Sequence, residues 1–269
     1  MKRSILMKMA CRVADRTFTN VLLRPAEWLV RRFSSVGQHP FFDPAKFDWI
    51  PRIEAGWPAM RDELRLLLRK GERIPSFHEI SPDQLKITQD DKWKTYMLYM
   101  YGRKIAENCA RCPETTRLIE AIPGIKTAFF SILAPRKHLP EHRGPYSGVL
   151  RYHLGLIVPR QKEACRIRVD SEVAHWEEGR SVVFDDTYLH EVWNDTDEER
   201  VVLFVDFARP LSFPVSVLNN AVIWLFGRSG YVQEIVENVD EWNRHTGPAT
   251  TVAVGHRTRP DVDLPAAFS

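Results

Sequence analysis

The chain has 269 residues with a formal net charge of +3, and 44% of them are hydrophobic while 27% are charged. This length is enough to bury one large core or two small ones, and the composition is ordinary for a globular protein. So small a net charge gives no argument for nucleic-acid binding, and no apolar run approaches the ~20 residues that span a bilayer.

The cysteines point to a reducing environment. Four cysteines in a chain of this length do not form a disulfide framework, and Cys109 and Cys112 form a single C-A-R-C motif. Without a second pair a zinc ribbon is excluded, which leaves a redox pair or, as we favour, two reduced and partly buried thiols. Because no signal-peptide pattern is present, we expect a cytoplasmic protein.

The N-terminal stretch is basic and helical in pattern. Residues 3–34 have helical spacing that is interrupted or restarted at Pro25, and eight Lys or Arg stand against two acidic residues through Phe33. Such a helix either lies peripherally on an anionic surface, such as that of an inner membrane, or packs on the protein. We assign residues 1–45 to this N-terminal extension.

The next elements change from helix to strand. Residues 37–48 read as a linker with aromatic anchors, helical spacing returns from Trp57 to Leu68, and Gly71 follows as a stop. Alternation from Trp93 to Tyr101 predicts a strand, and a short helix is expected over 115–122. Further strands are predicted in quick succession, at 126–133, 149–158, 165–169, 181–184 and 201–207.

Short strands that follow one another without helices between them favour an antiparallel barrel or jelly roll. We therefore expect a mainly β fold with flanking helices over residues 46–210. Beyond Pro210 the pattern is helical again, near 215–225 and 231–244. We assign residues 211–269 to these helices and a tail, packed on or near the same domain.

Five polar side chains in the strand region are candidate site residues. Along the strand 149–155, alternation places Arg151 and His153 on one face, which points either into a cavity or to solvent. His142 lies on a loop and His190 follows a turn, so each alone reads as well as a capping or core residue. Together, two histidines fit a non-haem iron site, and Arg200, ten residues after His190, suits a dicarboxylate co-substrate.

Five segments carry a resemblance to a known family. H-R-G-P, L-R-Y-H-L-G-L, W-E-E-G, V-F-D-D-T-Y-L-H-E-V-W and the following Arg resemble the aspartyl/asparaginyl β-hydroxylases, which are Fe(II)- and 2-oxoglutarate-dependent dioxygenases. The match is close from Ser131 to Phe207 and looser from about Trp93. The resemblance implies a double-stranded β-helix core and an enzyme that uses Fe(II), 2-oxoglutarate and dioxygen to hydroxylate an unactivated carbon.

The resemblance also implies roles for individual residues. His142 and His190 would be the iron ligands, with no further catalytic side chain beyond the iron site. Arg200, assisted by Ser131, would hold the distal carboxylate of 2-oxoglutarate. His153 would contact the carboxylate on the metal side.

Two more positions, Arg151 and Tyr99, take their expected roles from the resemblance. Arg151 would bind a substrate carboxylate. Tyr99 stands where the animal enzymes have an indole in the co-substrate pocket, so we expect it to line that pocket.

Gly144 bears on the substrate. Most oxygenases of this class carry Asp or Glu two residues after the first histidine, as a third metal ligand, whereas this chain has Gly144. The animal aspartyl hydroxylases resemble it there, with water in the ligand position, while the related lipid A hydroxylases carry H-R-D-P. The sequence therefore favours the β-carbon of Asp or Asn in a peptide or protein. The alternatives are a lipid A-type acyl hydroxylase, which the basic N-terminal stretch favours, and a jelly-roll binding module without chemistry.

Overall fold

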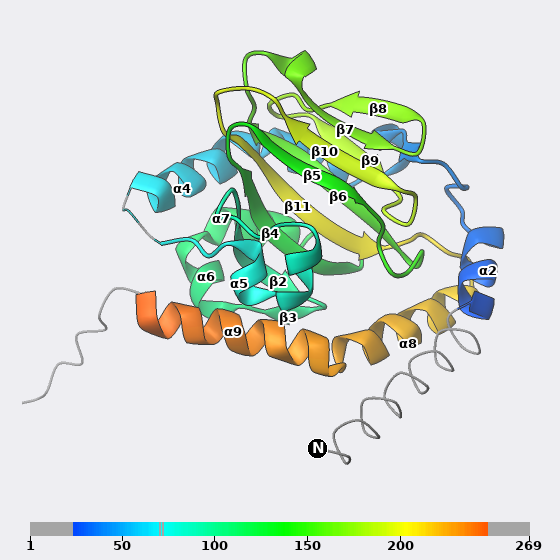
Figure 1. Ribbon diagram of the computed structural model, residues 1–269. Coiled ribbons are helices and arrows are strands. Elements are labelled where there is room, and N and C mark those ends of the chain that lie inside the picture. Colours follow the sequence, from blue (N-terminus) through cyan, green and yellow to red (C-terminus); the bar gives the residue numbers. More distant parts are fainter. Residues whose placement is uncertain (1–23, 70, 72, 247–269) are drawn as a thin grey trace, which may run out of the picture.

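A computed structural model describes residues 24–69, 71 and 73–246 (Figure 1). Within these residues the named strands form two antiparallel sheets. In spatial order, the larger sheet contains β1 (Phe41–Phe42), β9 (Ser181–Phe184), β6 (Val149–Ile157), β11 (Arg200–Ala208), β4 (Ile125–Leu133), β2 (Trp93–Met100) and β3 (Arg103–Lys104). The smaller sheet contains β5 (Lys137–His142), β10 (His190–Asn194), β7 (Cys165–Val169) and β8 (Glu172–His175).

The strand order is that of a jelly roll. From β4 to β11 the chain passes back and forth between the sheets, giving the order β4-β11-β6-β9 in one and β5-β10-β7-β8 in the other. Strand β1 extends one edge of the larger sheet, and β2 and β3 extend the opposite edge. The expected mainly β fold with flanking helices and a double-stranded β-helix core is confirmed.

Helices cover the outside of this core (Figure 1). They are α2 (Arg24–Arg32), α3 (Ile50–Ala55), α4 (Trp57–Arg69), α5 (Phe77–Ile80), α6 (Ala106–Arg111), α7 (Pro113–Ile119), α8 (Val215–Gly227) and α9 (Gly230–Thr246). Three short 3-10 segments lie at Pro44–Lys46, Pro82–Lys86 and Lys162–Ala164. Among the described residues, none of the helices is both long enough and apolar enough to cross a membrane.

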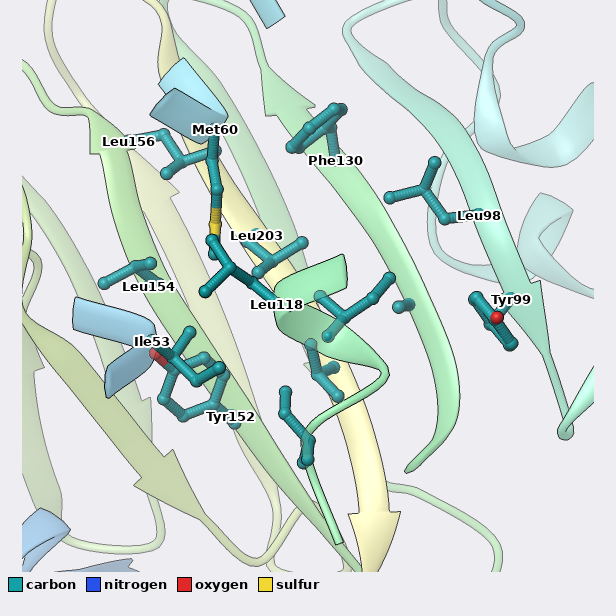
Figure 2. Packing of buried hydrophobic residues seen from close by; sticks show 14 of the residues in the cluster. Ile53, Met60, Leu98, Tyr99, Leu118, Phe130, Tyr152, Leu154, Leu156 and Leu203 are labelled. Carbon is teal, nitrogen blue, oxygen red and sulfur yellow. The ribbon is translucent and has the colours of Figure 1, made fainter. Parts of the chain in front are cut away.

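The main core lies between the helices and one face of the larger sheet. Met60 of α4, Leu118 of α7 and Ile53 of α3 pack against Phe130 of β4 and Leu203 of β11 (Figure 2). Each of these side chains is almost fully buried, and burial of a large apolar side chain contributes about 1.5–3 kcal/mol. The helices thus cover one face of the larger sheet, and its other face is turned toward the smaller sheet.

The second core lies between the two sheets. Leu133 and Val202 of the larger sheet meet Leu139, Ile167 and Val192 of the smaller one. Neighbouring side chains of a strand point to opposite faces, so every second side chain of β11 and β6 faces the helices instead of the smaller sheet. The inter-sheet space therefore receives only selected side chains, and the candidate site residues are among them.

Most predicted elements are confirmed within a residue or two, but five strands of the described residues were missed, namely β5, β8, β10 and the two-residue strands β1 and β3. Strands β5, β8 and β10 have no clear apolar alternation, and β5 and β10 are joined with a register shift between His190 and Val192. His142, expected on a loop, is the last residue of β5, and His190, expected after a turn, is the first of β10. Residues 1–23 of the predicted N-terminal helix lie outside the described residues, and the division into three segments stays a prediction.

Candidate functional site

His142 and His190 face each other across two neighbouring strands. They are directly paired in the β5–β10 register, and their ring centroids lie 4.2 Å apart. The Nδ1 atom of His142 donates to the carbonyl oxygen of Pro140 at 2.7 Å, and that of His190 to the carbonyl of Tyr188 at 3.0 Å. Since a carbonyl oxygen only accepts, both rings hold their proton on Nδ1 and keep the Nε2 lone pair free.

Both imidazoles are also neutral. Burial, reinforced by nearby positive charge, lowers the pKa of His142 below its usual value and that of His190 to about 3. Two neutral rings with free Nε2 atoms, each held by a backbone carbonyl, are the donor set that a divalent transition metal binds. The pair therefore fits a metal. In the described part of the chain, however, no cluster of three or more His, Cys, Asp or Glu side chains is placed to hold one.

Arg200 is a buried cation at the start of β11. Its side chain is 2% exposed, its guanidinium lies 4.6 Å from the centre of the Trp176 ring, and burial lowers its pKa to about 10. Among the described residues, its Nε and Nη1 atoms have no hydrogen-bond partner. An unpaired buried guanidinium is costly, so its donors mark a place for an anion, and a carboxylate matches their planar geometry.

Ser131 lies on β4, one strand over from Arg200, and is oriented by an indole. The Nε1 atom of Trp93 on β2 donates to the Ser131 hydroxyl oxygen at 3.0 Å, which leaves the hydroxyl proton free to donate elsewhere. Ser131 is buried, and it lines the same pocket as Arg200. The serine and the arginine together offer several donors to one anion.

His153 lies on β6 among aromatic rings. It stacks near Trp176 and meets Phe184 and Phe204 at centroid distances of 5.1 and 5.0 Å. Burial, with Arg200 and Arg151 as further causes, lowers its pKa well below the usual value, so the ring is neutral. Neither ring nitrogen has a hydrogen-bond partner within the described residues. A neutral ring whose nitrogens lack such partners can form hydrogen bonds with a bound carboxylate or water.

Arg151 faces the site but is already paired. Its Nη2 atom lies 2.8 Å from the Asp186 carboxylate, its Nε donates to Asp206 at 2.9 Å, and its guanidinium lies 4.3 Å from the centre of the Phe204 ring. Two carboxylates thus compensate one guanidinium. Burial raises the pKa of Asp186 to about 7 in spite of the attraction of Arg151. Asp206 is the cross-strand neighbour of Arg151 in the β6–β11 pair.

These side chains line two connected spaces. The inner pocket is lined by six of the predicted residues, namely Ser131, His142, Arg151, His153, His190 and Arg200. A larger outer cleft shares Trp93, His142, Arg151 and Phe204 with it and extends toward α9. The outer cleft is mainly apolar, with Met97, Met100, Phe129, Tyr101 and Tyr231 among its lining residues.

The sequence profile of the family described as Aspartyl/Asparaginyl beta-hydroxylase matches residues 54–210, which is more than half of the chain and includes every residue of the inner pocket. The chain belongs to this β-hydroxylase family. The resemblance seen in the sequence is therefore confirmed, and so is the expectation of a hydroxylase-type enzyme.

Individual relatives of this chain are named for different substrates. The chain is 46% identical over 219 residues to the ornithine lipid ester-linked acyl 2-hydroxylase of Rhizobium tropici, covering 81% of this chain and 78% of that protein. It is 32% identical over 197 residues to the aspartyl/asparaginyl beta-hydroxylase of Mus musculus, covering 66% of this chain but only 26% of the mouse protein. Among solved structures, a prolyl-4-hydroxylase of Pseudomonas putida aligns with 57% of this chain and 87% of that one, at 18% identity and a TM-score of 0.37.

Tyr99, which was expected to line a co-substrate pocket, does not line the inner pocket. A register shift between Met97 and Tyr99 in the β2–β4 pair turns Tyr99 to the opposite face of the sheet. There it packs in the main core (Figure 2) and donates to Glu120. The indole of the pocket comes from Trp93, six residues earlier, because it lies before the shift and faces Ser131.

Three further residues of the site were missed by the sequence analysis. Asp206 and Phe204 follow Arg200 at even spacing on β11, so strand alternation alone would have placed them on the same face. Trp176, in the W-E-E-G segment, lies under the Arg200 guanidinium with its side chain fully buried. Its contact with Arg200 joins residues far apart in the sequence, and only the fold brings them together.

Gly144 has no room for a side chain. A Cβ atom there would lie 2.1 Å from the Asp186 Oδ2 atom, and the Gly144 amide donates to the Asp186 carbonyl at 2.7 Å. The space beside Gly144 is therefore taken by Asp186. Arg151 holds the Asp186 side chain in place.

Gly144→Ala is expected to lower the free energy of unfolding by about 2–4 kcal/mol, because Asp186 is buried and cannot move aside. Urea unfolding measures the loss. Gly230→Ala is the matched control, since nothing lies within 4 Å of a Cβ at that position. The double variant Gly144→Ala with Asp186→Ala should lose less than the sum of the single losses. Additive losses would contradict the contact.

Proposed function

We propose that this protein is an Fe(II)- and 2-oxoglutarate-dependent dioxygenase that hydroxylates an unactivated carbon of a fatty acyl chain. With iron, 2-oxoglutarate and dioxygen bound, the site would supply the oxidant that converts C–H to C–OH, with release of succinate and carbon dioxide. The unpaired, buried guanidinium of Arg200, in one pocket with two neutral histidines, is the observation that carries the reaction class.

In this proposal each residue of the inner pocket has a defined task. His142 and His190 would hold the metal through Nε2, since the Pro140 and Tyr188 carbonyls keep their protons on Nδ1. Arg200 would grip the distal carboxylate of 2-oxoglutarate with its free donors. Ser131 would add the hydroxyl proton that Trp93 leaves available.

The remaining pocket residues would position the co-substrate and exclude water. His153 would contact the metal-side carboxylate, because both of its ring nitrogens are open. Leu139, Ile167 and Val192 line the pocket with apolar surface from the smaller sheet. Because this apolar lining excludes water, it strengthens the electrostatic interactions of the charged groups in the pocket and limits side reactions with water.

The outer cleft supports an acyl substrate. Its lining includes methionine and aromatic side chains such as Met97, Met100 and Phe129, which suit a flexible alkyl chain. Arg151, the cation at its inner end, already has Asp186 and Asp206 as partners, so a substrate carboxylate would compete with two buried carboxylates. The Rhizobium relative, which is named for acyl hydroxylation, resembles this chain over most of both lengths.

An Asp or Asn residue in a peptide remains the second candidate. Arg151 is a cation at the junction of the inner pocket and the outer cleft, which is where a substrate carboxylate would approach the metal. The similarity to the mouse protein also covers two thirds of this chain. The peptide substrate predicted from Gly144 therefore stays a prediction.

A succinate-release assay separates these possibilities. The protein, loaded with Fe(II) under low oxygen, is given 2-oxoglutarate with either acyl lipids in detergent micelles or a panel of Asp- and Asn-containing peptides. Stimulated succinate release with lipids, together with a mass gain of one oxygen in the acyl chain, supports the acyl proposal. Stimulation only by peptides overturns it in favour of the second candidate. Failure to bind 2-oxoglutarate at all would count against the reaction class itself.

Met100→Trp is expected to raise the KM for the acyl lipid by about tenfold or more, because the larger ring fills the outer cleft. Met100 is not among the residues of the inner pocket, so calorimetry should show unchanged affinity for 2-oxoglutarate. Leu66→Trp adds the same ring on the exposed surface of α4 and serves as the control. An unchanged KM in Met100→Trp would exclude the cleft as the acyl site.

A further inference from the structure

Helix α8 is apolar on both of its sides. Its sequence, V-S-V-L-N-N-A-V-I-W-L-F-G, contains no charged residue. One side packs on the protein, where Val215, Val222 and Ile223 meet Ala26 and Val30 of α2. A helix that is hydrophobic all round is normally covered on every side, so the opposite side needs explanation.

The opposite side of α8 is exposed to solvent. Together with the preceding loop it presents Phe213, Val217, Leu218, Ala221, Trp224 and Leu225, which we call the α8 face. Phe213 is 83% exposed, Trp224 55% and Leu225 44%. Within the helix these positions recur at intervals of one, three and four residues, so they form one continuous stripe. Single exposed apolar residues are ordinary, whereas a continuous stripe marks an interaction surface.

The charges around the α8 face have one predominant sign. Helix α2, which packs against α8, carries the exposed Arg24 and Arg32 against a single Glu27, whereas Arg31 donates to Thr187. Arg228 follows α8 directly. The exposed acidic residues of the C-terminal helices lie farther along, on α9, beginning at Glu234.

Two of these arginines lie over exposed aromatic rings. The Arg228 guanidinium is 3.9 Å from the centre of the Trp224 ring, and the Arg32 guanidinium is 5.5 Å from that of Phe33. Tryptophan and phenylalanine beside arginine are typical of segments that lie in the headgroup region of a bilayer. There the ring enters the acyl boundary while the cation meets a lipid phosphate.

We propose that the α8 face docks the protein on the surface of an anionic phospholipid bilayer. The apolar stripe enters the boundary between headgroups and acyl chains, and the exposed arginines of α2 and Arg228 pair with lipid phosphates. This occupant suits the surface better than a second copy of the chain does, because lipid phosphates are opposite in charge to the exposed arginines beside the stripe, whereas a second copy would bring the same arginines. The inference complements the proposed acyl substrate but does not rest on it.

The outer cleft lies next to this docking surface. Phe226, at the end of α8, meets the ring of Tyr101 at a centroid distance of 6.5 Å, and Tyr101 lines the cleft. Tyr231, in the first turn of α9, lines the same cleft. The junction of α8 and α9 thus forms part of the cleft wall, so docking through α8 would bring the cleft close to the lipid.

Co-sedimentation of the full chain with vesicles tests the proposal. Vesicles of phosphatidylglycerol mixed with phosphatidylcholine are compared with vesicles of phosphatidylcholine alone. The variant Trp224→Ser with Leu225→Ser should partition onto the anionic vesicles at least about tenfold more weakly than the unaltered chain. The control Leu66→Ser with Val173→Ser removes two apolar side chains, 53% and 51% exposed, from other elements and should bind normally.

Three results would overturn the proposal. They are no binding of the unaltered chain to anionic vesicles, equal binding by the α8 variant, and a dimer in gel filtration that the α8 variant alone dissociates. Equal binding would assign the interaction to another segment, and dissociation would assign the face to a second copy. Vesicle binding needs neither iron nor 2-oxoglutarate, so its outcome is independent of the proposed reaction. Turnover in detergent micelles should be unchanged in the α8 variant.

Discussion

His190→Ala and His142→Ala are each expected to abolish Fe(II) binding and to lower 2-oxoglutarate turnover by roughly three orders of magnitude or more, about 4 kcal/mol in the barrier. The physical reason is the small donor set. Because only two neutral imidazoles of the described residues are placed for the metal, removal of either one leaves a single ligand from this part of the chain. Anaerobic Fe(II) titration measures the binding, and succinate release measures the turnover.

His138→Ala is the matched control for these variants. His138 lies on the same strand, β5, but its ring stacks on Trp193 at 5.1 Å and contacts Glu191 at the outer surface. It should therefore retain metal binding and turnover. Native turnover in either His142→Ala or His190→Ala would exclude the proposed metal site.

Arg200→Met is expected to have opposite effects on binding and stability. Loss of the planar set of guanidinium donors should weaken the binding of 2-oxoglutarate by about a hundredfold or more, near 3 kcal/mol. In the absence of co-substrate, however, the variant should unfold about 1–3 kcal/mol less readily, since it no longer buries an uncompensated cation. A residue that destabilises the empty protein while binding its ligand is typical of a functional site.

Thermal unfolding with and without 2-oxoglutarate measures both effects of Arg200→Met. The unaltered protein should gain stability from the co-substrate through mass action, and the variant should gain none at the same concentration. Arg200→Lys keeps the charge but loses the planar fork, so its affinity should lie between the two. A destabilised Arg200→Met that still binds 2-oxoglutarate normally would show that Arg200 is structural.

Local patterns in the sequence were enough for most of the fold. Strand β7 follows apolar alternation, β6, β9 and β11 are short runs rich in apolar residues, and α4 follows helical spacing. Strands β5 and β10 were missed, since they contribute histidines and charged residues rather than an apolar stripe. These two strands carry both candidate metal ligands, so the weakest pattern lay where the site is built.

What is known of the site also comes partly from the sequence and partly from the tertiary structure. The motifs by themselves indicated the family, the pair His142 and His190, and Arg200 as a partner for an anion, because these are residue types at fixed spacings. The tertiary structure alone decided that Trp93 rather than Tyr99 lines the pocket, since a register shift reverses the faces of a strand. It also showed that Asp186 takes the space beside Gly144 and pairs with Arg151. Such contacts join residues from different strands, and only the packing of the two sheets brings them together.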